Sequence, residues 1–141
     1  MDTDVEGNKA AQKIRELYLN DIAAGQETKF KILLLGKAAG VSKTDVAIED
    51  LFPDEFYLNC TNKAYGVSME LSDLPADGST LITKRVESVL VARHGKKSLD
   101  KGLVMQRVLD EFDQWNSIDD LPAGTADHAE KLFEAINSAF M

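Results

Sequence analysis

Two aspartates stand two residues apart at the start of the chain, in "MDTDVEGNKAAQKI". Side chains at positions i and i+2 of an extended segment share a face, so Asp2 and Asp4 could bind one or two Mg²⁺ ions together. Such ions orient a phosphodiester and stabilise the charge that develops as it breaks. The alternative interpretation is a helix N-terminus, where acids interact favourably with the helix dipole. The spacing alone leaves both interpretations open.

Two other binding motifs are only partly present. "DTDVEG" matches the first six positions of an EF-hand calcium loop, but the twelfth position, which needs a bidentate acid, is Lys13. The apolar stretch "KFKILLLG" leads into "KAAGVSKT", an order that P-loops share. Val41 and Ser42, however, occupy the positions of the second glycine and of the lysine. The sequence therefore argues against both sites.

Composition limits the class of protein. The 141 residues suffice for one hydrophobic core, and the single cysteine, Cys60, favours a reducing compartment. No apolar run approaches the roughly 20 residues of a membrane helix, so we expect a cytoplasmic protein and no membrane partner. The net charge of -8 argues against a self-sufficient nucleic-acid binder. Residues 84–107 nevertheless carry seven bases and two acids, which indicates either a solvated helix face or a phosphate-facing patch.

Hydrophobic periodicity and capping residues predict mostly helices. The continuous apolar run Ile32–Leu35, within "KFKILLLG", is typical of a strand covered on both faces, as in a parallel sheet. An amphipathic helix is expected before it and several helices after it. The expected helices span residues 8–22, 48–52, 53–65, 79–93, 98–112 and 125–140.

Two segments resemble a known family. "DTDVEGNKAAQKI" resembles the Asp-x-Asp motif of TOPRIM domains, and "DVAIEDLFPDEFY" resembles a later segment of the OLD (overcoming lysogenization defect) family of TOPRIM nucleases. The resemblance implies an α/β fold, a truncated TOPRIM-like parallel sheet of few strands with a mostly helical C-terminal half. Residues 1–72 would form the partial core, and residues 73–141 a helical region packed on it.

The resemblance also implies site residues. Asp2, Asp4 and Glu49 would bind Mg²⁺ or Mn²⁺, although the family often has Ser or Thr where this chain has Ala47. Lys101, in "LDKGLVMQRVL", best matches the family's catalytic lysine. The alternatives for that lysine are Lys84, Lys96 and Lys97.

In the family a glutamate-bearing strand precedes the two aspartates, and an ATPase domain lies on the N-terminal side. We therefore expect the chain to be a fragment of a metal-dependent DNA endonuclease that hydrolyses phosphodiesters in the intact parent and is inactive alone. DNA and the upstream ATPase domain are the expected partners, and homo-oligomerisation stays open. The alternative function is a small, non-catalytic helical interaction module.

Overall fold

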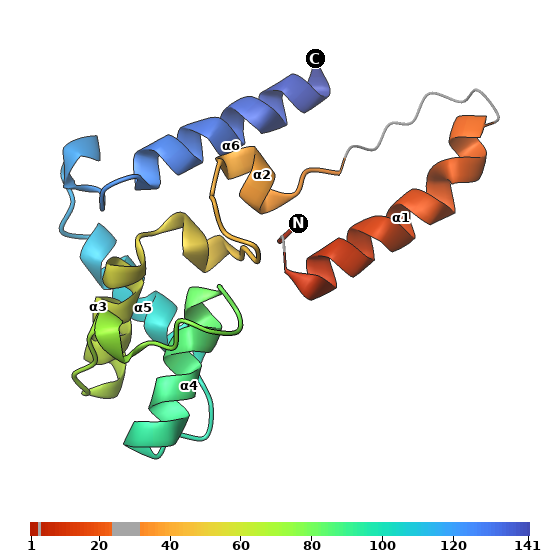
Figure 1. Cartoon of the computed structure of the whole chain (residues 1–141). Coiled ribbons are helices and arrows are strands. Elements are labelled where there is room, and N and C mark those ends of the chain that lie inside the picture. The colour runs from red at the N-terminus through yellow and green to blue at the C-terminus, as the bar shows by residue number, and fades with distance from the viewer. Residues whose placement is uncertain (3, 24–31) are drawn as a thin grey trace.

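The computed structural model describes residues 1–2, 4–23 and 32–141, without the side chains of residues 18–23 (Figure 1). The described part of the chain forms α-helices and short 3-10 helices. The α-helices are α1 (Val5–Ala23), α2 (Leu35–Ala39), α3 (Asp54–Tyr65), α4 (Ile82–His94), α5 (Lys101–Phe112) and α6 (Thr125–Phe140). The 3-10 helices are η1 (Ile48–Leu51), η2 (Leu71–Asp73) and η3 (Ile118–Asp120).

The predicted α/β fold with a truncated parallel sheet is wrong, because the described residues contain helices and no strand. Residues 29–31 of the predicted strand lie outside the described residues, and Leu35 already begins α2. The remaining part of the run contacts the first residue of the chain. Leu33 O accepts a hydrogen bond from the Met1 amine at 3.2 Å, and Leu35 N donates one to Met1 O at 2.8 Å. This pattern is that of neighbouring parallel strands. One paired residue is too little to build a stable sheet, which needs several strands with a buried face.

The helices of the second half lie close to where periodicity predicts them. The expected helices at 79–93 and 98–112 are observed as α4 and α5, each beginning three residues later. Gly66 and Gly95 end α3 and α4 in the left-handed conformation, with φ of 63° and 62°. Glycine reaches these angles without the steric cost that a side chain imposes, which is why it marks helix ends in a sequence.

The hydrophobic core lies between α3, α4 and α5, which cluster together in Figure 1. Its largest buried side chains include Tyr57, Ile82 and Leu90. The remaining members are Leu58, Cys60, Met69, Leu74, Val86, Val89, Val104 and Val108. This cluster draws residues from both sides of position 72, where a boundary between two regions was predicted.

A second group of helices covers the other end of the molecule. In Figure 1, α6 lies along α2, and α1 extends away from both. His128 Nδ1 of α6 lies 3.0 Å from Leu51 O, so one hydrogen bond ties α6 to η1. Among the described helices, none is long and apolar enough to cross a bilayer.

Candidate active site

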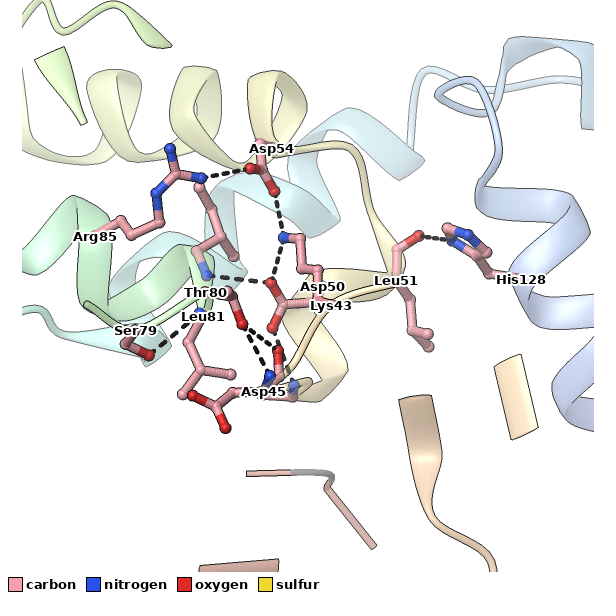
Figure 2. Close-up of polar contacts among 12 residues, drawn as sticks. Lys43, Asp45, Asp50, Leu51, Asp54, Ser79, Thr80, Leu81, Arg85 and His128 are labelled. Atoms are coloured by element: carbon pink, nitrogen blue, oxygen red, sulfur yellow. Dashed lines mark hydrogen bonds and ion pairs between the residues drawn. The ribbon is translucent and has the colours of Figure 1, made fainter. Parts of the chain in front are cut away.

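Asp50 fixes the position of η1, the short helix that carries Glu49. Its side chain is fully buried and accepts hydrogen bonds from Ala47 N at 2.9 Å and from Ile82 N at 3.1 Å, as Figure 2 shows in part. Lys43 Nζ lies 2.7 Å from the same carboxylate. Two backbone donors and one cation thus satisfy the hydrogen-bonding capacity of this buried carboxylate. The result is a fixed connection between η1 and the first turn of α4.

A second carboxylate extends this network to α3. Asp54 pairs with Lys43 at 2.6 Å and with Arg85 at 2.8 Å (Figure 2). Arg85 Nε also donates a hydrogen bond to Pro75 O at 3.0 Å. Hydrogen bonding and ion pairing with Asp50 and Asp54 raise the pKa of Lys43, although burial of the ammonium opposes the shift more than any single one of these contacts favours it. The network thus joins η1, α3 and α4 through charged groups that satisfy one another.

Asp4 caps the first helix, and Gly7 lets the chain turn tightly there. Asp4 Oδ1 accepts a hydrogen bond from Gly7 N at 2.7 Å, so part of its role is the helix-terminal one that spacing had left open. A Cβ built on Gly7 would stand 1.9 Å from Asp2 O. A side chain at position 7 would therefore displace the backbone of Asp2. The glycine keeps both aspartates at the same turn.

The two aspartates face a cleft of about 320 Å³ together with Lys101. Lys101 is the first residue of α5, and Asp100 before it caps that helix by accepting from Leu103 N at 3.1 Å. Besides these three residues, the cleft is lined by Ala47, Leu81, Thr83, Lys84, Glu87 and Leu99. The cleft is thus lined by acidic, basic and apolar side chains.

Glu49 lies beside this cleft and is almost completely buried. Lys101 Nζ lies 2.9 Å from Glu49 Oε1, and the Glu49 side chain is only 6% exposed. Glu49 Oε2 is buried and has no hydrogen-bond partner among the residues that the structure describes. A buried carboxylate oxygen without a donor is costly, so an unpartnered one indicates strain or a ligand position.

The carboxylates of Asp2, Asp4 and Glu49 lie close enough to interact electrostatically. Burial raises the pKa of Asp2, and the charges of Asp4 and Glu49 raise it further, while Lys101 and the Met1 amine oppose the shift. Burial also raises the pKa of Tyr57, and the charge of Glu49 adds to that effect. The carboxylates therefore share one electrostatic neighbourhood, a setting in which a cation would relieve the repulsion.

The sequence-predicted residues are placed as follows. Asp2, Asp4 and Lys101 line one cleft, and Glu49 contacts Lys101. Among the described residues, no group of three or more His, Cys, Asp or Glu side chains is close enough to hold a metal ion. Of the alternative lysines, Lys84 lines the cleft and Lys96 lies over the Tyr65 ring at 5.8 Å. Lys97 is exposed in the segment between α4 and α5 and is not part of the cleft lining.

Three residues that matter for the site were not singled out from the sequence. Asp50 anchors Glu49, Glu87 lines the cleft, and Gly7 shapes the aspartate turn. Gly7 carries a visible signal, a glycine just after alternating acids. Glu87 follows Lys84 by three residues on a predicted helix, a spacing that brings side chains together. Asp50 carries no such signal, because its partners lie up to 32 residues away.

Comparison with family models, curated proteins and solved structures finds no match for this chain. The functional interpretation therefore depends on the residues of the cleft and on the two resembling segments.

Proposed function

We propose that the cleft is the metal and phosphate site of a metal-dependent DNA endonuclease, the activity that the resemblance to the OLD family implies. The observation that carries this proposal is Glu49. Its carboxylate is buried beside the aspartate pair, with one oxygen paired to Lys101 and the other without a partner in the described part of the chain. A purely structural buried carboxylate would have both oxygens satisfied, as Asp50 does.

The three acids carry the type of ligand that a hard divalent cation needs, but in the described residues they do not lie close enough together to hold one, so the proposal requires them to move together when the ion binds. Asp2, Asp4 and Glu49 offer carboxylate oxygens, the ligands that Mg²⁺ and Mn²⁺ prefer. When bound there, the ion supplies Lewis-acid stabilisation of the charge on a phosphodiester. Lys101, more than half exposed, can pair its Nζ with a phosphate oxygen next to the carboxylates. Thr83 and Ala47 also line the cleft.

We propose that cleavage takes place in the cytoplasm and also needs the glutamate-bearing strand and the ATPase domain that the resemblance implies. For the present chain the proposal requires metal binding. Positioning is decisive for turnover, since displacement of a ligand by about 1 Å can cost on the order of a hundredfold in rate.

Calorimetric titration with Mn²⁺ tests the proposal. The wild-type chain should bind the ion, and the Asp2→Asn/Asp4→Asn double variant should bind it at least about tenfold more weakly. Glu130→Gln/Glu134→Gln removes two charges from exposed positions of α6 and is the matched control. Equal Mn²⁺ affinity in all three proteins would remove the aspartates from the site and end the proposal.

A helical interaction module is the second candidate, and one observation favours it. Helix α6 exposes Phe133 and Phe140, at 64% and 83% of their surface. Large exposed aromatic side chains on one helix are typical of contact surfaces. If the module interpretation holds, Phe133→Ser/Phe140→Ser should abolish a self-association measurable by analytical ultracentrifugation and leave Mn²⁺ binding unchanged. A wild-type chain that sediments as a monomer at every concentration would contradict it.

A further inference from the structure

Two lysines line the cleft, and they are held in different ways. Lys101 is paired with the buried Glu49 at 2.9 Å. Lys84, in the first turn of α4, pairs with Glu87 at 3.3 Å, and its side chain is 64% exposed. A surface ion pair between residues i and i+3 contributes only about 0.3–0.5 kcal/mol. The ammonium of Lys84 can therefore exchange Glu87 for another anion at little cost.

Glu87 connects Lys84 to the start of α5. Its Oε1 accepts a hydrogen bond from Leu99 N at 3.1 Å, while Oε2 accepts from Lys84 Nζ at 3.3 Å. Leu99 lies two residues before Lys101, so one carboxylate contacts both segments that carry the cleft's lysines. The hydrogen bond from Leu99 N lowers the pKa of Glu87, and the nearby lysines lower it further, although burial partly opposes them.

The position of Lys84 suits an anion for a second reason. Leu81, Thr83 and Lys84 of the cleft lining belong to the beginning of α4, a helix of 13 residues. The N-terminal end of a helix carries a partial positive charge that favours phosphate. Asp50 already accepts from Ile82 N at this end, and the exposed ammonium of Lys84 adds a full positive charge beside it.

We infer that Lys84 is a second phosphate-binding residue of the cleft, which contacts the backbone of a polynucleotide while Lys101 contacts the phosphate beside the carboxylates. The inference rests on the proposed function for the identity of its ligand. Glu87 holds Lys84 at the cleft wall when no phosphate is present. A backbone phosphate offers Lys84 the same kind of charge-assisted contact as the carboxylate of Glu87 that it replaces. Lys84 is thus a binding residue for the substrate backbone, distinct in role from Lys101.

The test uses the full chain and a fluorescein-labelled single-stranded DNA oligonucleotide, titrated in the presence of Mg²⁺ and followed by anisotropy. Lys84→Ala should weaken binding about five- to tenfold and lower the slope of log affinity against log salt by about 0.7, the value for one phosphate contact on a single strand. Lys84→Arg should keep most of the affinity. Lys97→Ala is the matched control, since it removes the same charge from an exposed position outside the cleft.

Each outcome decides one question. Equal effects of Lys84→Ala and Lys97→Ala on affinity and salt slope would overturn the inference, and so would a wild-type chain that binds no oligonucleotide. Mn²⁺ titration of Lys84→Ala separates this failure from failure of the proposed function. Wild-type-like Mn²⁺ affinity in this variant, together with the about five- to tenfold weaker oligonucleotide binding, is the result expected. Loss of Mn²⁺ affinity would show that Lys84 acts on the metal ligands instead, and would contradict its assignment as a phosphate contact.

Discussion

Replacing Lys101 by methionine removes the only cation that contacts Glu49 in the described structure. Methionine keeps much of the lysine stem but carries no charge. The Glu49 side chain is 6% exposed, and its Oε2 already lacks a partner, so the variant leaves the whole carboxylate uncompensated. Lys101 itself is 57% exposed, so water reaches the ammonium in the wild-type protein. The expected effect is a loss of stability that depends on Glu49.

The magnitude follows from these two exposures. Breaking a fully buried ion pair costs about 3–5 kcal/mol, whereas an exposed pair contributes about 0–1 kcal/mol. The Lys101–Glu49 pair has one buried and one half-exposed member, so we expect Lys101→Met to cost about 1–2 kcal/mol. Glu49→Gln removes the buried charge and keeps the shape. The double variant should therefore recover most of the loss, with a coupling energy of about 1–2 kcal/mol.

Urea unfolding of the four proteins in the presence of EDTA measures this cycle. Lys97→Met, at an exposed position, controls for loss of a surface charge. Addition of Mn²⁺ at about 100 times its dissociation constant should stabilise a binding-competent protein by about 2.7 kcal/mol. Lys101→Met should bind Mn²⁺ at least as tightly as the wild type, because Lys101 no longer competes for Glu49.

Two results would refute this reasoning. If the single variants add within about 0.3 kcal/mol, the lysine and the glutamate are not coupled. If Lys101→Met is as stable as the wild type, the carboxylate either is solvated or has another donor.

Three further outcomes follow from the structure. Gly7→Ala should raise the helicity measured by circular dichroism, since alanine favours a helix over glycine by about 0.5–1 kcal/mol. The same variant should weaken Mn²⁺ binding, because the new Cβ would clash with Asp2 O. An unchanged Mn²⁺ affinity would contradict this expectation. Asp50→Asn should cost about 2–4 kcal/mol in urea unfolding, because Lys43 loses a buried partner, and a loss below about 1 kcal/mol would contradict it. The lowered pKa of Glu87 stabilises the fold above the ordinary carboxyl pKa, and this contribution is lost as pH falls through the folded value. Glu87→Gln should therefore make the free energy of unfolding depend less on pH on the acid side. Urea unfolding between roughly pH 3 and 6, where such carboxyls titrate, measures this dependence. A stability profile parallel to that of the wild type would contradict the expectation.

Local signals predicted most of the long helices close to their observed positions. The sheet that they also predicted is not found in the described residues. The ends of α3 and α4 follow from Gly66 and Gly95, because a left-handed C-terminal residue is a property of one or two positions. A strand depends on partners that the local pattern does not contain. The run Ile32–Leu35 has the composition of a buried strand, yet Leu35 begins α2, and within the described residues Met1 alone pairs with the run as a neighbouring strand would. Composition therefore misassigned a segment whose conformation is decided by its neighbours.

The candidate site divides in the same way. Asp2, Asp4, Glu49 and Lys101 were named from the resemblance, and the structure places three of them on one cleft with the fourth paired to Lys101. The residues that position them were not named. The hydrogen bond between Asp50 and Ile82 N spans 32 positions. Contacts at such separation leave no periodic trace in a single sequence.

The basic stretch at residues 84–107 shows why a charge count does not identify a binding surface. Most of its cations already have acidic partners: Arg93 pairs with Asp73, Arg107 with Asp110 and Arg85 with Asp54. Ion pairs of this kind leave little net field over the surface. Lys84 and Lys101 differ because both line the cleft that Asp2 and Asp4 face. Under the proposed function, an anion would bind between these two lysines once a divalent ion has neutralised the neighbouring carboxylates. Binding of DNA by this acidic chain should accordingly require the divalent ion, and the Asp2→Asn/Asp4→Asn variant, which lacks two of the negative charges, should lose that requirement.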